Sequence, residues 1–437
     1  MTAAPLISRL FIYTAIGAVI AGAAMPHRAA AASFYLQDQS VKGLGRAYSG
    51  EVADQGAESL WWNPAAIARS PNEIYIGENS ILTSSTVQDR GSSITYPGGA
   101  TFPTGGDPRA FNPVEFGVVP NGAVSYRLND RFAIGLSTAA PYDFTSTYSS
   151  NSFARYNSLK SRLTTIDIAA TGAMRVTDWL DLGVSVNTEY TSANLGNALP
   201  NLSPLLPDGQ ETLRGDGWNV GYTVGAQAHF GQWEFGASYK SAMDHDLSGT
   251  ATVSGLLGPL AANNFSTGAQ AHFTTPWIAT VGARYHLTPK LTLNVQAERF
   301  GWSEFGSIDV KASALLSENI VQGYRDTTSG AVGVDYKVTD KWVMRAGVGY
   351  DQSPTQTKYR NSFVPDSDRM LYTIGTSFKP TQKLTVDAGF GYVAFRGSHL
   401  DYTTQDYPGT PLVTNFTEKG NVSGEAKILS VGARYAY

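Results

Sequence analysis

The sequence predicts an all-β fold: a 14-stranded antiparallel transmembrane β-barrel with a small helical N-terminal hatch plugging the lumen. Three observations support this prediction. Most of the chain alternates apolar and polar residues, short polar turns alternate with long loops, and one Gly-rich stretch near the N-terminus follows neither pattern. Alternation over about ten residues is typical of a half-buried strand, and a tilted strand of that length spans a bilayer.

The composition agrees with a barrel and excludes several other classes. Only 16% of the 437 residues are charged, yet mean hydropathy is −0.17, because alternate residues of such strands face lipid and a polar lumen. The net charge of −4, without a Lys/Arg cluster, argues against nucleic acid as a partner. The absence of cysteine excludes disulfides, thiolate metal sites and a Cys nucleophile.

Residues 1–31 are predicted to be a signal peptide, cleaved after Ala31 or Ala32. Arg9 precedes a short apolar run, Leu10–Ala24, and small residues follow at 29–32. The run is shorter than the ~20 residues that a spanning helix needs. An uncleaved anchor is the alternative.

Residues 32–71 are predicted to form the hatch. The stretch Gly43–Glu51 is Gly-rich, and Trp61-Trp62 precedes an Asn-Pro-Ala sequence. Asn is a favoured N-cap and Pro suits the first turn, so a short helix is expected to begin there. The residues expected to act as the hatch or gate are Gly43, Gly45, Asn63, Pro64 and Ala65.

Residues 72–437 are predicted to form the barrel. In the strand 290–300, Leu291, Leu293 and Val295 alternate with polar residues. Short turns such as 128–131 and 338–341 alternate with long loops such as 196–214 and 354–367, which indicates periplasmic turns and external loops. The joins give roughly 14 strands, an even number as in bacterial single-chain barrels. The residues expected in the interfacial aromatic girdles are Trp179, Trp218, Trp233, Trp277, Trp302 and Trp342.

One predicted strand, Phe132–Ala140, is interrupted by Pro141, Tyr142 and Asp143. Proline cannot donate to a strand ladder and belongs at an edge or bulge. Two interpretations stay open from the residues: the strand simply ends there, or the barrel wall opens locally.

Enzyme motifs are not found. The sequence has no nucleophile elbow, P-loop or zinc-type His pair, and its histidines are dispersed. We therefore predict no catalytic residue, no metal site and no cofactor. A hydrolase triad assembled across strands is the remaining enzymatic alternative.

With these residues in view, the chain resembles the FadL-type outer-membrane transporters of long-chain fatty acids and other hydrophobic compounds (OMPP1/FadL/TodX). The resemblance covers essentially the whole mature chain. The motifs that carry it are Gly43–Glu51, Asn63-Pro64-Ala65, Arg155-Tyr156, Trp302-Ser303 with Phe305, Arg325-Asp326, Gly349–Pro354 and Pro365–Arg369.

The resemblance implies a monomeric barrel in the bacterial outer membrane that takes up a hydrophobic ligand passively. External loops would capture the ligand, the hatch would move, and the ligand would leave sideways into the membrane lipid through an opening at Pro141, Tyr142 and Asp143. Asp143 stands where the family commonly has Gly, which puts the shape of the opening in doubt.

The resemblance also suggests ligand-binding residues. Phe34 and Leu36, near the new N-terminus, are placed to touch the ligand. The family's basic residue late in the fifth strand is not found near Asn194 to Asn197, so Arg325 becomes the leading carboxylate anchor. Arg155, Lys160 and Arg162 are candidates for external capture. Uptake of aromatic hydrocarbons by the same fold and a general porin are the alternatives.

Overall fold

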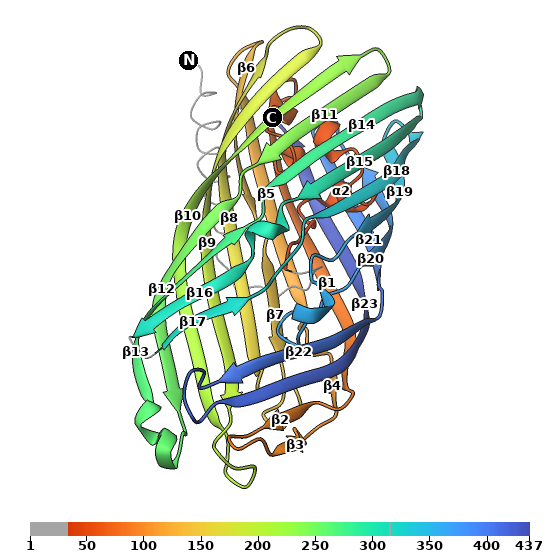
Figure 1. Cartoon of the computed structure of the whole chain (residues 1–437). Helices are drawn as coiled ribbons and strands as arrows, with labels where there is room; N and C mark the ends of the chain where they lie inside the picture. Colours follow the sequence, from red (N-terminus) through yellow and green to blue (C-terminus); the bar gives the residue numbers. More distant parts are fainter. Residues whose placement is uncertain (1–33, 314–315) are drawn as a thin grey trace.

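The computed structural model describes residues 34–313 and 316–437, so the predicted signal peptide and its cleavage site lie outside the described residues. The chain forms a tall, tilted cylinder of antiparallel strands that closes where the last wall strand pairs with the first, from Glu73↔Ala436 to Asp89↔Gly420 (Figure 1). The pairings give 14 positions around the wall, which confirms the predicted barrel.

Several of these positions are shared by two strand segments in succession. In order around the wall, the strands are β1 (Glu73–Asp89), β5 (Gly117–Arg127), β6 (Phe132–Ala139) with β7 (Asp143–Thr147), β8 (Lys160–Arg175), β9 (Leu180–Leu199), β10 (Gly209–Phe230), β11 (Trp233–Lys240) with β12 (Met243–Ser254), β13 (Phe265–Thr275) with β14 (Ile278–Thr288), β15 (Leu291–Phe300) with β16 (Ser307–Ser313), β17 (Leu316–Val321) with β18 (Thr327–Thr339), β19 (Trp342–Asp351), β20 (Arg369–Phe378), β21 (Leu384–Phe395) with β22 (Ser398–Asp406), and β23 (Thr414–Ala436).

Shorter elements complete the fold. The strands β2 (Ser93–Thr95), β3 (Thr101–Pro103) and β4 (Arg109–Phe111) extend the wall at the end that carries the long joins (Figure 1). The helices are α2 (Val41–Leu44), η1 (Glu51–Ala53), η2 (Ala57–Ser59), η3 (Pro64–Ile67), η4 (Gly258–Asn263), η5 (Trp302–Glu304) and η6 (Thr357–Tyr359). None of the helices in the described ranges is long and apolar enough to cross a bilayer.

The two faces of the wall differ as the alternation predicts. Along β10, Trp218, Val220 and Tyr222 point outward and are 59%, 68% and 49% exposed, which is expected of lipid-facing residues in an isolated chain. Asn219, between the first two, and Thr223, directly after Tyr222, face the lumen and are buried. Outward aromatics thus occur where a girdle belongs.

One girdle prediction is wrong. Trp302 is only 3% exposed and lies in η5, inside the wall, where it packs edge-on against Phe34 with ring centroids 5.1 Å apart. The sequence shows an aromatic residue directly after a strand end, but it cannot show that the chain turns inward at that point.

Candidate functional site

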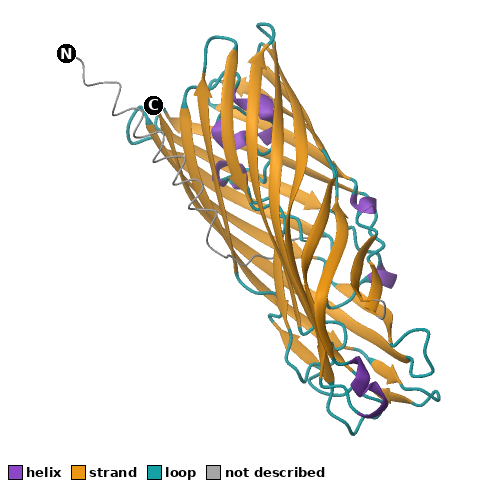
Figure 2. Ribbon diagram, turned by 90° about the vertical axis from the view of Figure 1, so that its left-hand side faces the viewer, coloured by secondary structure: helices purple, strands orange, loops and turns teal. Residues whose placement is uncertain are grey.

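The N-terminal segment, residues 34–72, lies inside the barrel near the end that holds the C-terminus (Figure 2). Its short helices contact different sectors of the wall: α2 contacts β20, β21 and β23, η1 contacts β10, β11 and β14, and η3 contacts β6, β8, β9 and β10. Nearly all of its residues are buried. The segment therefore fills the lumen at this level.

Buried ion pairs fasten the segment to the wall. Arg46 donates to Asp335 of β18 at 3.1 Å, and Glu58 lies 3.2 Å from Arg434 of β23. Asp54 pairs with Arg284 of β14. Burial alone would raise the pKa of Asp54, but Arg284 and two cations of the segment hold it well below its usual range. Removing one partner of a buried pair typically costs about 3–5 kcal/mol, so these contacts hold the segment firmly.

Asn63 links the segment to the wall through its amide. Its oxygen accepts from Ala65 N at 3.0 Å and so caps η3, in which Pro64 occupies the first turn, as predicted. Its nitrogen donates to the Val52 carbonyl at 2.7 Å and to the Ala226 carbonyl of β10 at 3.0 Å. One side chain thus joins two helices of the segment and one strand.

Glycines in the wall make room for the segment. A Cβ at Gly236 of β11 or at Gly347 of β19 would collide with segment backbone, at Val52 and at Arg46 respectively. On the segment side, Gly45 packs against Gly375 of β20. The prediction missed these wall glycines, although they sit at inward positions of the alternating strands and could have been found there.

The third wall position is broken, and the strand does not simply end. β6 stops at Ala139 and β7 resumes at Asp143, while their common partner β8 runs on from Asp167 to Thr164. The chain takes four residue steps from Ala139 to Asp143, whereas β8 takes three between their partners Asp167 and Thr164. The broken strand therefore has one extra residue, as in a β-bulge.

The N-terminal segment supplies the hydrogen bonds that the break would otherwise lose. Leu36 N donates to the Pro141 carbonyl at 2.8 Å, and Asp143 N donates to the Phe34 carbonyl at 3.1 Å. The Gln39 amide both accepts from Ala140 N and donates to its carbonyl. The segment and the broken strand are thus one hydrogen-bonded unit.

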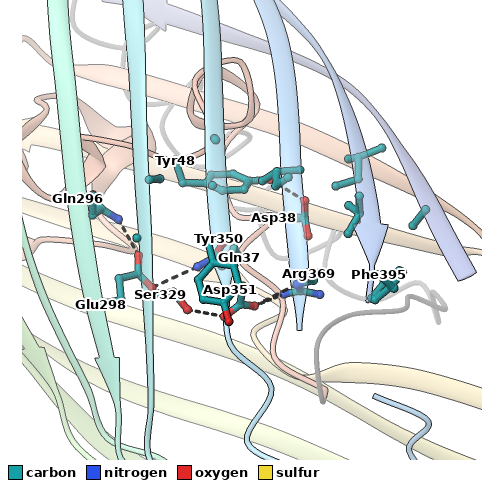
Figure 3. A pocket seen from close by; sticks show the side chains of 18 of the residues that line it. Gln37, Asp38, Tyr48, Gln296, Glu298, Ser329, Tyr350, Asp351, Arg369 and Phe395 are labelled. Carbon is teal, nitrogen blue, oxygen red and sulfur yellow. Dashed lines mark hydrogen bonds and ion pairs between the residues drawn. The ribbon is translucent and has the colours of Figure 1, made fainter. Parts of the chain in front are cut away.

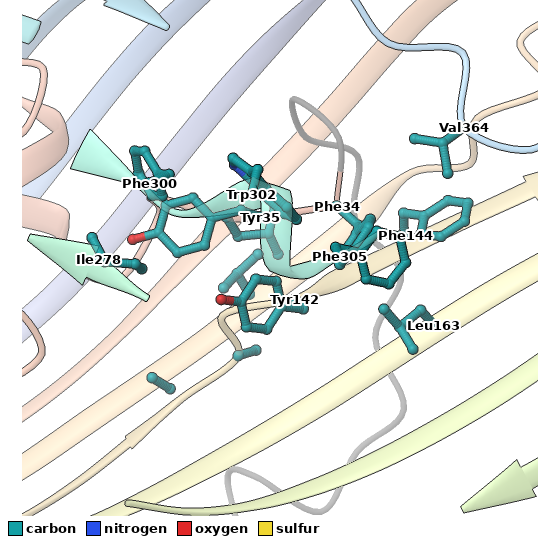
Figure 4. Packing of buried hydrophobic residues seen from close by; sticks show 14 of the residues in the cluster. Phe34, Tyr35, Tyr142, Phe144, Leu163, Ile278, Phe300, Trp302, Phe305 and Val364 are labelled. Atoms are coloured by element: carbon teal, nitrogen blue, oxygen red, sulfur yellow. The ribbon is translucent and has the colours of Figure 1, made fainter. Parts of the chain in front are cut away.

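Next to this break lies an apolar cavity of about 690 Å³, part of it open to solvent. Phe34 of the segment, Phe144 of β7 and Phe305 after η5 meet there, with Phe34 and Phe305 centroids 5.0 Å apart (Figure 4). Leu36 is fully buried among the same apolar side chains, which we call the inner cluster, but it does not line the cavity. The remaining apolar lining residues are Leu163, Ala193, Leu195, Leu213, Leu247, Ala269, Ala271, Phe273, Ile308, Val310 and Phe363.

Two arginines, Arg162 of β8 and Arg214 of β10, are among the residues that line the cavity. Their neighbours Leu163 and Leu213 pack into the inner cluster, so strand alternation places both guanidiniums on the outer face of the wall. Among the described lining residues, no cation therefore points into the cavity.

Arg325 is not among the residues that line the cavity. It directly follows Tyr324, whose ring centroid is 5.2 Å from that of Phe305, and its side chain is exposed. Arg155, by contrast, is engaged: it donates to Asp208 at 2.8 Å and contacts the Tyr156 hydroxyl. Of the two, Arg325 is better placed to meet a ligand.

A second arginine beside Arg325 was not predicted. Arg360 follows η6, is 8% exposed, and donates to the Thr355 carbonyl at 2.8 Å. Burial lowers the pKa of its guanidinium from the usual range, against the opposing effect of Asp366 and Asp368, and the charge of Arg325 acts in the same direction as burial. Because the two residues are brought together from different loops, no local sequence signal indicates the pair.

A separate cavity of about 640 Å³, with both polar and apolar side chains in its lining, lies between the segment and β1, β15, β18, β19, β20, β21 and β23 (Figure 3). Tyr48 donates to Asp38 at 2.5 Å, and Arg369 donates to Asp351 at 2.6 Å. Its lining includes the carboxylates of Asp38, Glu298 and Asp351, which distinguishes it from the apolar cavity beside the break. Within the described ranges, no group of three His, Asp or Glu side chains is placed to hold a metal ion.

A closed, even-stranded antiparallel barrel with an apolar outer band, exterior aromatics and a polar interior defines an outer-membrane barrel protein. The chain belongs to the family of outer membrane protein transport proteins (OMPP1/FadL/TodX), whose model matches residues 22–437.

Named relatives and solved structures agree with this family. The chain is 25% identical to outer membrane protein P1 of Haemophilus influenzae, over 93% of this chain and 95% of that protein. It is 24% identical to the long-chain fatty acid transport protein of Escherichia coli K12, over 88% and 93%. A Pseudomonas aeruginosa FadL homologue has the same fold, with a TM-score of 0.81, 24% identity and coverage of 93% and 100%. The Pseudomonas putida toluene transporter TodX matches with a TM-score of 0.65, 18% identity and coverage of 93% and 99%.

Proposed function

We propose that this outer-membrane protein is a passive uptake channel for hydrophobic compounds, long-chain fatty acids first, and that it acts as a monomer. The observation that carries the proposal is the apolar cavity, one wall of which is Phe34 of the N-terminal segment and another Phe144 of the broken strand. Similarity to the long-chain fatty acid transport protein of Escherichia coli supports the choice of substrate.

The cavity offers the binding energy that such a ligand needs. Each buried methylene contributes about 0.8 kcal/mol, so an acyl chain transfers readily from water into this lining. A carboxylate, however, needs a charged partner when it leaves water. Arg325 and Arg360, beyond the Tyr324 ring, are the cations we assign to that role, with the acyl chain in the cavity and the head group at its end.

Release sideways follows from the hydrogen bonds between segment and break. A ligand that displaces Phe34 pulls on the bonds of residues 34–36 to Pro141 and Asp143, and these are the bonds that keep the broken strand in place. Movement of the segment therefore loosens the wall at Pro141, Tyr142 and Asp143. The gating role of Gly43, Gly45, Asn63, Pro64 and Ala65 is part of the same proposal.

Neutral aromatic hydrocarbons are a second candidate substrate, because no cation among the described lining residues points into the cavity. The test compares oleate and toluene uptake in a deletion strain carrying the wild type, R325A/R360A, or the control R109A at an exposed arginine of β4. We expect the double variant to take up oleate roughly tenfold more slowly, as loss of a charge-assisted partner implies, and toluene at the normal rate. Oleate uptake equal to that of the wild type would instead favour neutral compounds.

A general porin is the other alternative, and conductance distinguishes it. In planar bilayers, the purified protein should show no large steady current, because the N-terminal segment fills the lumen. A large steady current would contradict the proposed plug.

A further inference from the structure

Three cations form a row across the outer face of the wall: Lys160 and Arg162 on β8 and Arg214 on β10. The register places Arg162 and Arg214 on either side of Asn194 of β9, so their Cα atoms lie about 10 Å apart, two strand spacings. Lys160 lies two residues before Arg162, at the first position of β8. We call these three residues the outer cationic row.

The register also fixes the height of this row. Ile166, Tyr190 and Trp218 face one another across the same three strands, and the Tyr190 and Trp218 rings are 5.3 Å apart. After Trp218, toward the short turns, the outward residues of β10 are apolar and exposed. This aromatic pair therefore marks the edge of the lipid-facing band that is nearer the long loops.

The outer cationic row lies four residues nearer the long β9–β10 connection, hence toward the cell exterior. Four residues of a tilted strand raise it by about 10 Å, and long basic side chains reach back along the wall. The row is therefore level with the headgroups of the outer leaflet.

The cations of the row lack the partners that neutralise other arginines of this protein. In the part of the chain that the structure describes, none of the three forms an ion pair. Arg162 donates to the Thr164 hydroxyl at 3.3 Å, and this hydroxyl lies 3.5 Å from the carboxylate of the buried Asp143, whose charge interacts with that of Arg162. Asp216, two residues below Arg214, accepts a hydrogen bond from Tyr190. Arg214 and Lys160 thus remain free to bind an anion, while Arg162 is linked to Asp143 only through the Thr164 hydroxyl.

We propose that the outer cationic row binds the phosphorylated headgroup of lipopolysaccharide in the outer leaflet. Phosphate is the anion that arginine forks fit bidentately, and a phosphate-bearing lipid is always present at this height of an outer-membrane barrel. The row begins on β8, which pairs with the broken strand, and crosses three strands to β10, so an extended lipid headgroup can contact all of it. Bound there, one lipid headgroup lies beside the broken strand.

Native mass spectrometry of the purified barrel tests the proposal, with bisphosphorylated lipid A and its dephosphorylated form as probes. The variants are R162A/R214A, the conservative R162K/R214K, and the control K427A, an outward lysine that is paired with Glu425. All three positions are at the outer face, and heat-modifiable electrophoresis verifies the fold.

We expect the wild type and K427A to carry bisphosphorylated lipid A, R162A/R214A to bind it at least about tenfold more weakly, and R162K/R214K to retain part of the binding. The dephosphorylated probe should bind weakly to every variant. Unchanged binding to R162A/R214A, an equal loss in K427A, or equal binding of the dephosphorylated probe would each overturn the proposal. Loss of oleate binding in R162A/R214A with lipid A binding intact would also overturn it, and would assign the row to the substrate carboxylate.

Discussion

Replacing Gly347 by alanine should loosen the N-terminal segment without disturbing the barrel. At this inward position of β19, the Cα of Gly347 faces the backbone of Arg46. A methyl group added to that Cα would collide with the Arg46 backbone. Overpacking of this kind costs about 1–3 kcal/mol, which shifts a two-state equilibrium about 5- to 150-fold toward the displaced segment. Displacement also breaks the Arg46–Asp335 pair, and this cost opposes displacement in the wild type and in the variant alike.

The assay is the entry of a large polar antibiotic into cells, together with conductance of the purified protein. Gly172 of β8 is the matched control, because a methyl group added there meets no atom within 4 Å. We expect G347A to leak and G172A to behave as the wild type, with both barrels heat-modifiable. The reasoning is refuted if G347A stays sealed, or if it fails to assemble as a barrel, since the segment would then be a folding element.

Further predictions concern the same segment and the cavity. N63A should leave barrel assembly intact but lower transport severalfold. It removes the η3 cap, worth about 1 kcal/mol, and a hydrogen bond to β10. Uptake by cells equal to that of the wild type would contradict this prediction. The lowered pKa of Asp54, which arises because the nearby cations outweigh burial, means that its pair with Arg284 stabilises the segment fully above the usual carboxyl pKa. That stability is lost only as pH falls through the lowered value, so limited proteolysis should release the segment in strong acid, and D54N should be released already at neutral pH. A271W should fill the cavity beside Phe305 and slow oleate uptake at least about tenfold while the seal to polar antibiotics is kept; undiminished uptake would place the ligand elsewhere.

The sequence by itself determined the barrel. Alternation with period two reports which face of a strand is buried, and the lengths of turns and loops report the up-and-down order, so strand number and orientation follow from local information. The cap formed by Asn63 and Pro64 is equally local and was predicted correctly. The interruption at Pro141 was also visible, because proline lacks the donor that a ladder requires.

Only the tertiary structure decided what these elements contact. The hydrogen bonds from residues 34–36 to the break, the meeting of Arg325 with Arg360, and the burial of Trp302 join residues that are distant in the chain. Such contacts depend on how the wall closes and how the segment folds within it, and neither leaves a periodic trace in the sequence. The closure of the wall also brings Tyr324, the neighbour of Arg325, against Phe305, whereas the outward face of Arg162 follows from the alternation along β8.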